Sequence, residues 1–201
     1  EEYSPKFNIL IKHIQSNPNK DALYFVYSNI ITNGLEKLQT ILNANRISNV
    51  MLTSTMDDKK ILETINQFNT QHILAPKIRV VLGSKKISEG ITLKNVTNIF
   101  ILTPWYNMTE IDQAVARCIR YKSHESLLKI KPAPIPIEIF LLCQYDKESN
   151  TSIDISMYNT SIEKDFEIKT LERYIAENAF DCILNKSQNQ TGEDGSRNCN
   201  Y

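Results

Sequence analysis

Two arginines three positions apart, Arg117 and Arg120, have the side chains best suited to chemistry in this sequence. They end a segment whose apolar spacing predicts an amphipathic helix, which also carries Gln113. Residues three apart on a helix share one face, with Cβ atoms about 5–6 Å apart. A guanidinium is always charged and its planar fork of donors suits phosphoryl oxygens. An arginine that enters a phosphate pocket from outside can accelerate phosphoryl transfer by on the order of 10³–10⁵.

The residues before this helix decide how the pair is interpreted. A polar loop at residues 84–90 is followed by an apolar run at 98–102, and a Pro-Trp turn at 104–105 leads into the helix. Two arginines taken alone are more often a solvated helix edge. A loop with a glycine such as Gly90 is often an ordinary connection in which the glycine serves backbone geometry. Both interpretations stay open at this point.

The elements that must position these residues alternate between strands and helices. Apolar runs predict strands at residues 22–27, 49–52, 78–82, 99–102 and 135–143. Helical spacing lies between them, including residues 57–69, and the Ser4-Pro5 pair starts a first helix. This alternation predicts an α/β fold with a mostly parallel sheet flanked by helices. Ligands of such sheets bind outside the carboxyl ends of the strands, where residues 28–29, 53–55, 84–90 and 103–105 are expected.

Two motifs give the chain a family resemblance. The run from Gln113 to Arg120, QAVARCIR, resembles motif VI of superfamily 2 helicases, QxxGRxxR, with Ala116 in place of glycine. Residues 84–96, SKKISEGITLKNV, resemble motif V of the same proteins. Their order, across a strand and a helix, is a strong indication of the second, RecA-like lobe of such a helicase.

Further segments extend and narrow the resemblance. Residues 22–28 resemble motif IV, and the Pro-Trp-Tyr-Asn turn at 104–107 resembles that of Swi2/Snf2-type translocases. Residues 121–124, Tyr-Lys-Ser-His, with the proline-rich gap and the helical segment 168–182, are similar to nucleoside triphosphatases of large cytoplasmic DNA viruses. These include the poxvirus-like NTPase and the ATPase subunit of the early transcription factor. The resemblance implies a role in viral transcription.

The resemblance implies a nucleotide-binding role for one set of residues. Arg120 corresponds to the arginine finger that reaches the γ-phosphate across a cleft, and Arg117 corresponds to its phosphate-binding companion. Gln113 corresponds to the residue that links the nucleotide state to the rest of the site. Glu89 and Gly90 correspond to the part of motif V that approaches ATP.

A second set is implied in nucleic-acid binding. Ser84 and Lys85 correspond to the start of motif V, which contacts the sugar–phosphate backbone. Ser28, Thr53 and Ser54 are weaker candidates for the same strand, since such contacts fix register without reading sequence. Short hydroxyl side chains and loop amides can bind phosphates without net positive charge. DNA is preferred over RNA as the expected partner.

The sequence has no GxxxxGK[ST] and no DExH-like carboxylate pair after an apolar strand. ATP and Mg²⁺ are the expected cofactors, but the phosphate cradle and the Mg²⁺ ligands must then come from a preceding lobe of the same protein. We therefore expect this part alone to be inactive as an ATP hydrolase. RNA polymerase or another transcription-factor subunit is a further expected partner.

Composition bounds these expectations. The 201 residues have a formal net charge of zero, so the overall charge gives no indication of nucleic-acid binding. The four cysteines form no CxxC pair and the three histidines lie far apart, so no disulfide framework or metal site is expected. No membrane-length apolar run or signal peptide occurs, so neither a membrane partner nor secretion is expected. The expected location is host cytoplasm or virion for a viral protein, and otherwise cytoplasm or nucleus.

The chain divides into three parts. Residues 1–146 are expected to form the lobe, 147–185 a helical appendage with one long or two short helices, and 186–201 a polar, disordered tail. Because the first residue is Glu1, we expect a fragment of a longer protein. The alternative function is a non-catalytic α/β scaffold that binds a polymerase or transcription partner. A small-molecule α/β enzyme is a third possibility, although no glycine-rich fingerprint or nucleophile–base pair is visible.

Overall fold

A parallel sheet forms the centre of the molecule. The computed structural model describes residues 4–53, 56–84, 91–131, 134–148 and 150–179. Within these ranges five strands pair in the order β2-β3-β1-β4-β5, and every neighbouring pair is parallel. The strands are β1 (Leu23–Tyr27), β2 (Asn49–Leu52), β3 (Val80–Gly83), β4 (Val96–Ile101) and β5 (Glu138–Leu141). The predicted α/β fold with a mostly parallel sheet is confirmed.

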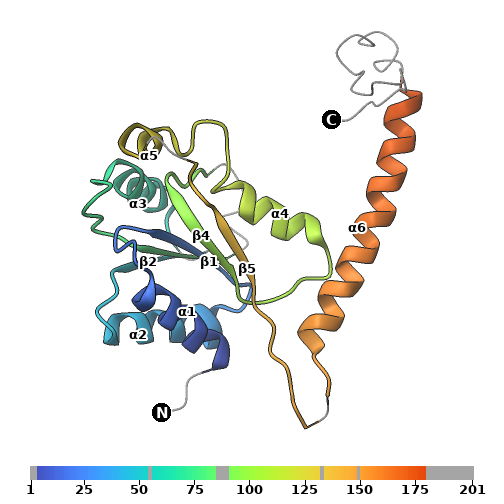
Figure 1. Cartoon of the computed structure of the whole chain (residues 1–201), viewed down its shortest axis with the longest axis horizontal. Helices are drawn as coiled ribbons and strands as arrows, with labels where there is room; N and C mark the ends of the chain where they lie inside the picture. The colour runs from blue at the N-terminus through green and yellow to red at the C-terminus, as the bar shows by residue number, and fades with distance from the viewer. Residues whose placement is uncertain (1–3, 54–55, 85–90, 132–133, 149, 180–201) are drawn as a thin grey trace.

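Helices cover both faces of the sheet (Figure 1). They are α1 (Pro5–Ser16), the π-helical turn η1 (Ile31–Glu36) that continues into α2 (Lys37–Ala44), α3 (Asp58–Thr70), α4 (Met108–Ala116), α5 (Glu125–Ile130) and α6 (Ile153–Asn178). One core cluster joins α1 and α2 to the sheet, and a second joins α3 and α4 to the opposite face. The described chain is therefore a three-layered α/β/α lobe.

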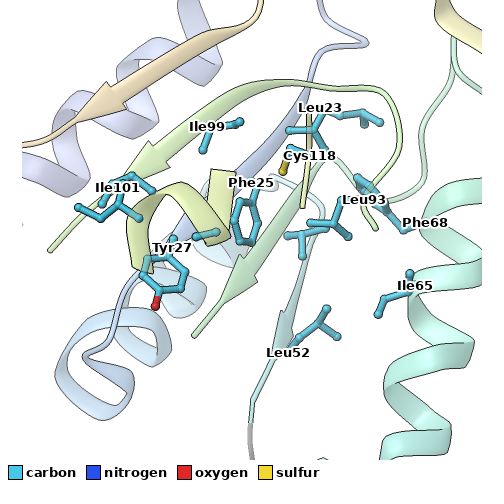
Figure 2. Packing of buried hydrophobic residues seen from close by; sticks show 14 of the residues in the cluster. Leu23, Phe25, Tyr27, Leu52, Ile65, Phe68, Leu93, Ile99, Ile101 and Cys118 are labelled. Carbon is cyan, nitrogen blue, oxygen red and sulfur yellow. The ribbon is translucent and has the colours of Figure 1, made fainter. Parts of the chain in front are cut away.

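The central strand β1 explains why the sequence shows a continuous apolar run rather than an alternating one. All five of its residues are buried. Leu23, Phe25 and Tyr27 belong to the cluster on the α3 and α4 side, whereas Tyr24 and Val26 belong to the cluster on the α1 and α2 side. A parallel strand with helices over both faces needs apolar residues at every position. Figure 2 shows the cluster on the α3 and α4 side, to which side chains of β1, β4 and α3 contribute.

The helices present the apolar stripes that the sequence predicts. In α1, Leu10, Ile11 and Ile14 are buried, and Pro5 stands in the first turn, where its missing N–H costs nothing. In α3, Ile61 and Ile65 are buried at helical spacing, together with Phe68. Burying a large apolar side chain stabilises a fold by about 1.5–3 kcal/mol. These stripes therefore fix the helices against the sheet and set the positions of the strand ends.

The predicted arginine helix is wrong at its carboxyl end. Helix α4 ends at Ala116, so Arg117 caps it and Arg120 lies beyond it. The Arg117 and Cys118 amides bond to carbonyls three residues back, which tightens the last turn and stops the α-helical pattern. Ile119, which a longer amphipathic helix would place on its apolar face, is 41% exposed. The two arginines therefore do not share a helix face.

Strand limits also differ from the predictions. Strand β3 begins at Val80 rather than at residue 78, and β4 begins at Val96, before the expected start. Strand β5 covers Glu138–Leu141, a shorter segment than the predicted 135–143. Its side chains are mostly exposed because it is the edge strand, next to β4 alone.

The last described helix, α6, is a single helix of 26 residues. It extends away from the sheet (Figure 1), and its first half contacts the lobe, where the side chains of Tyr158 and Ser161 are buried. The Ser161 hydroxyl donates to the carbonyl oxygens of Trp105 and Met157. Residues 180–201, which include the predicted tail, lie outside the described residues. Among the described helices none is both long and apolar enough to cross a membrane.

Candidate functional site

Small polar residues follow three neighbouring strands at the carboxyl edge of the sheet. Leu52, Gly83 and Tyr27 are aligned in register across β2, β3 and β1, so Thr53, Ser84 and Ser28 come next to one another along this edge. We refer to the region formed by Ser28, Thr53, Ser84 and Thr103 as the strand-end edge. Ser28, Thr53 and Ser84 are 1%, 6% and 4% exposed, so the sheet itself orients them. The predicted gathering of these loops at one edge is confirmed for the described residues.

Ser28 and Thr103 connect the ends of β1 and β4. The Ser28 hydroxyl oxygen accepts from the Ile30 amide at 3.1 Å and lies 3.4 Å from the Thr103 hydroxyl oxygen. The Thr103 oxygen in turn accepts from the Asn29 amide at 3.2 Å. Each hydroxyl replaces a backbone partner that the chain loses where the strand ends. The turn after β1 is therefore held in one conformation.

An open pocket of about 770 Å³ adjoins this turn. Lys6 and Lys37 line it together with Asp154. The Lys6 ammonium, however, donates to the carbonyl oxygen of Leu102 at 2.6 Å and pairs with Asp154 at 2.6 Å. This charge therefore ties α1, the end of β4 and the start of α6 together, and it is not available to hold an anion in this arrangement.

Behind the strand-end edge, Tyr27 fixes the start of α4 to the end of β1. Its hydroxyl donates to Glu110 Oε1 at 2.8 Å and lies 2.9 Å from Asn29 Oδ1. Burial raises the pKa of Tyr27, and the hydrogen bond and the negative charge of Glu110 raise it further. The phenol therefore remains a donor to the buried carboxylate.

The arginines lie elsewhere, in a loop of residues 117–124 that we call the arginine loop. The Leu93 amide donates to the Arg117 carbonyl at 2.9 Å, and the Asn95 amide donates to the Ser123 carbonyl at 3.0 Å. His124 Nε2 lies 2.7 Å from the carbonyl oxygen of Val96, the first residue of β4. The arginine loop is therefore attached at the amino end of β4, opposite to the strand-end edge.

The two arginine side chains differ in their surroundings. Arg117 is partly buried, and its Nε atom is inaccessible to solvent. Arg120 is exposed, with Nε donating to the Ala116 carbonyl at 3.1 Å and Nη1 donating to the Thr92 hydroxyl at 2.9 Å. Both acceptors of Arg120 are neutral oxygens. A phosphate oxygen would be a stronger, charge-assisted acceptor for the same guanidinium.

A short segment, residues 92–95, connects the loop after β3 to the arginine loop. Asn69 of α3 donates to the Thr92 carbonyl at 2.8 Å and accepts from the Lys94 amide at 2.8 Å. The same segment donates two amides to the arginine loop, as described above. Sequence reasoning missed Asn69 and Thr92, because a lone asparagine near a helix end and a loop threonine carry no distinctive spacing.

The predicted site residues thus separate into two groups. Ser28, Thr53 and Ser84 lie together at the strand-end edge, and Arg117 and Arg120 lie together in the arginine loop. Gln113 is exposed on α4. The remaining predicted residues lie outside the described residues: Ser54, Lys85, Glu89 and Gly90.

Metal and thiol chemistry has no visible support in the described part of the chain. No group of three or more His, Cys, Asp or Glu side chains there could hold a metal ion. Cys118 is a buried free thiol, and burial raises its pKa, which makes it a poor nucleophile.

Comparison with known proteins agrees with this fold. A crystal structure of the C-terminal part of the Fun30 ATPase domain matches with a TM-score of 0.60 at 19% identity, covering 77% of this chain and 43% of that one. The fold is therefore that of a RecA-like α/β lobe. The family described as the helicase conserved C-terminal domain matches residues 5–122, more than half of the 201 residues. The chain belongs to this family.

Viral proteins are among the relatives. "Putative helicase 087L" of Invertebrate iridescent virus 3 is 33% identical over 222 residues, covering 100% of this chain and 23% of that protein. "Putative helicase 009L" of Frog virus 3 is 35% identical over 215 residues, covering 100% of this chain and 22% of that protein. "Nucleoside triphosphatase I" of Melanoplus sanguinipes entomopoxvirus is 24% identical over 177 residues, covering 87% of this chain and 26% of that protein. The chain thus spans less than a quarter of the length of the two helicases.

Proposed function

We propose that this chain is the second lobe of an ATP-dependent nucleic-acid helicase or translocase and that Arg120 is its arginine finger. One observation carries the proposal. The Arg120 guanidinium is exposed and bonded to neutral oxygens, while the His124 side chain attaches its loop to the start of β4. The loop is fixed, and the guanidinium can exchange its neutral acceptors for phosphate oxygens. Both properties suit a group that stabilises negative charge as it develops on a transferring phosphoryl group.

In this proposal the other lobe supplies the phosphate cradle and the ligands of Mg²⁺, and ATP binds between the two lobes. Arg117 serves as the second phosphate-binding arginine, and Gln113 links the nucleotide to the lobe. Glu89 and Gly90 belong to the same site by their motif. The sequence of this chain has no phosphate-binding loop of its own, so hydrolysis by this part alone is not expected.

The strand-end edge is proposed to contact the backbone of the nucleic acid. Ser28, Thr53 and Ser84 place short hydroxyl groups in adjacent, almost fully buried positions, so the loop amides beside them belong to the proposed contact surface. Ser54 and Lys85 belong to the same loops by sequence. Such contacts hold a strand without reading its sequence. Relatives such as "Putative ATP-dependent RNA helicase L377" of Acanthamoeba polyphaga mimivirus, 32% identical over 123 residues, are named for RNA. Both DNA and RNA therefore belong among the test substrates, with DNA as our first choice.

The proposed roles of Arg120 at ATP and of the strand-end edge at the nucleic acid lead to a cycle of lobe closure and reopening. Closure of the two lobes around ATP brings Arg120 to the γ-phosphate and moves the strand-end edge along the nucleic acid. Hydrolysis releases the contact and the lobes reopen, a gating motion of the kind that many nucleotide-driven enzymes use. We propose a place for this cycle in viral transcription, with an RNA polymerase or transcription-factor subunit as a partner.

The test uses the full-length protein with Arg120→Ala and, as a matched variant, Arg120→Lys. Nucleic-acid-stimulated kcat should fall by on the order of 10³ or more in Arg120→Ala. It should recover little in Arg120→Lys, because an ammonium lacks the planar fork of a guanidinium. Nucleic-acid affinity, measured by fluorescence anisotropy, should change less than about threefold, within the effect of one weak interaction.

Two results would contradict the proposal. Unchanged turnover in Arg120→Ala would remove this residue from the nucleotide site. Absence of turnover in the wild-type protein, with binding to a polymerase or transcription subunit retained, would favour the non-catalytic scaffold instead.

A further inference from the structure

We propose that Ser123 and His124 are positioning residues that hold Arg120 in place for its role as the arginine finger. This inference rests on the proposed function, since it concerns the same arginine. Neither residue carries a phosphate-binding charge at the site, and both act through the backbone of the arginine loop. Their effect should therefore appear only while Arg120 is present.

A chain of three hydrogen bonds connects Arg120 to the sheet. The Arg120 amide donates to the Ser123 hydroxyl oxygen at 3.1 Å. That oxygen lies 2.8 Å from His124 Nδ1, and His124 Nε2 lies 2.7 Å from the Val96 carbonyl oxygen. A carbonyl can only accept, so Nε2 carries a proton, and in the neutral ring Nδ1 then accepts from the Ser123 hydroxyl. Every donor in the chain has an acceptor.

Each residue type is needed for its place in this chain. Ser123 is 3% exposed, and its hydroxyl accepts one hydrogen bond while it donates another. The imidazole of His124 has two nitrogens far enough apart to reach both Ser123 and β4. A hydroxyl or a short amide at position 124 could satisfy one of these contacts but not both. Burial of the serine makes a lost contact costly, because water cannot easily replace it.

We call the hydrogen bonds of Ser123 and His124 the brace. The backbone conformation between Arg120 and Ser123 shows why it is needed. Lys122, directly before Ser123, has a φ of 63°, a left-handed conformation that is unfavourable for a residue with a Cβ atom. The contacts on its carboxyl side offset this cost. The Asn95 amide adds one more, because it donates to the Ser123 carbonyl at 3.0 Å. Without the brace, the loop is free to relax and to move Arg120.

The position of Arg120 matters in addition to its presence. From its present backbone position, its Nε and Nη1 atoms reach the Ala116 carbonyl and the Thr92 hydroxyl. A displacement of about 1 Å of a catalytic group can cost about 10²-fold in rate. We therefore expect loss of the brace to lower kcat while the affinity for ATP, which depends on the other lobe, is nearly unchanged.

The experiment is a double-mutant cycle in the full-length protein, with Arg120→Ala, His124→Ala and the combined variant. His124→Ala should lower nucleic-acid-stimulated kcat by about 10- to 100-fold with less than about threefold change in KM. In the Arg120→Ala background the same substitution should have no further effect on kcat. His124→Gln, whose amide nitrogen can still donate to Val96, should recover part of the loss.

Hydrogen exchange of the peptide containing residues 117–124 provides a readout that does not depend on turnover. Its amides should exchange faster in His124→Ala and in Ser123→Ala, and nearly as in wild type in Arg120→Ala. A loss of kcat that persists in the Arg120→Ala background, or unchanged exchange, would overturn the positioning role. If Arg120→Ala itself keeps full turnover, the proposed function fails, and the inference fails with it. An Arg120 effect without a His124 effect overturns the inference alone.

Discussion

The strand-end edge and the arginine loop position their polar groups in opposite ways. At the edge, short side chains such as that of Ser28 are buried, and the register of parallel strands sets their spacing. In the arginine loop, a long side chain, Arg120, is exposed, and hydrogen bonds of the backbone hold it. The first arrangement is part of the folded core, whereas the second is attached to it.

This difference has an energetic consequence. A substitution at the edge removes hydrogen bonds from buried groups, so it should lower the free energy of unfolding. A substitution of Arg120 removes contacts from an exposed side chain, so it should leave stability within about 0.5 kcal/mol of wild type. Stability and turnover should therefore respond to different residues.

The largest expected effect on stability is at Tyr27, behind the strand-end edge. Tyr27→Phe leaves the buried Glu110 carboxylate without its phenol donor, and hydrogen bonds to charged groups contribute about 1.5–3 kcal/mol. Chemical denaturation should show a loss of this size. Tyr106→Phe is the matched control, because Tyr106 is 59% exposed and should show almost no change. Equal effects of the two variants would contradict the buried network.

Alkaline pH should weaken the same region. Burial raises the pKa of Tyr27 above its ordinary value of 10.0, and Tyr24 and Tyr158 shift in the same direction. The unfolded chain then loses these protons at a lower pH than the folded chain. Their contribution to stability is therefore complete below about pH 10 and is lost as pH rises above it. The unfolding free energy of Tyr27→Phe should fall less steeply in this range, and a parallel decline would contradict the assignment.

A smaller effect is expected where α3 holds the segment before β4. Asn69→Ala removes the donor to Thr92 and the acceptor for Lys94, and should cost about 1–2 kcal/mol for these two bonds. Asn66→Ala, at an exposed position of the same helix, is the control. Because this segment also contacts the arginine loop, kcat should fall together with stability. A loss of stability with unchanged kcat would show that this segment does not influence the arginine loop, and it would contradict the prediction.

Much of the fold could be predicted from the sequence because its strands are apolar throughout. The buried run of β1 and the helical stripes of α1 and α3 identify a parallel sheet covered on both faces. Once the sheet is parallel, the ends of its strands must meet at one edge, which places Ser28, Thr53 and Ser84. Local pattern and chain direction suffice for that half of the candidate site.

The arginine loop could not be predicted in the same way. The apolar spacing of residues 111–119 continues past the end of α4, so the sequence alone extends the helix to Arg120. The contacts that hold the chain after this end are one local and one tertiary: the Arg120 amide bonds to Ser123, and His124 bonds to the start of β4. Arg120 and Ser123 are 3 residues apart in the sequence, and His124 and Val96 are 28 residues apart. Neither contact produces a periodic pattern of apolar residues.

The most direct test compares Ser28→Ala and Arg120→Ala in the full-length protein, with kcat and nucleic-acid Kd measured for both. Arg120→Ala should lose turnover by on the order of 10³ and keep its Kd. Ser28→Ala should weaken the Kd about 2- to 10-fold, because the turn after β1 loses a hydrogen bond that holds it, and keep kcat at saturating nucleic acid. If either variant changes both quantities equally, or if the two effects are exchanged, the division between the arginine loop and the strand-end edge is wrong.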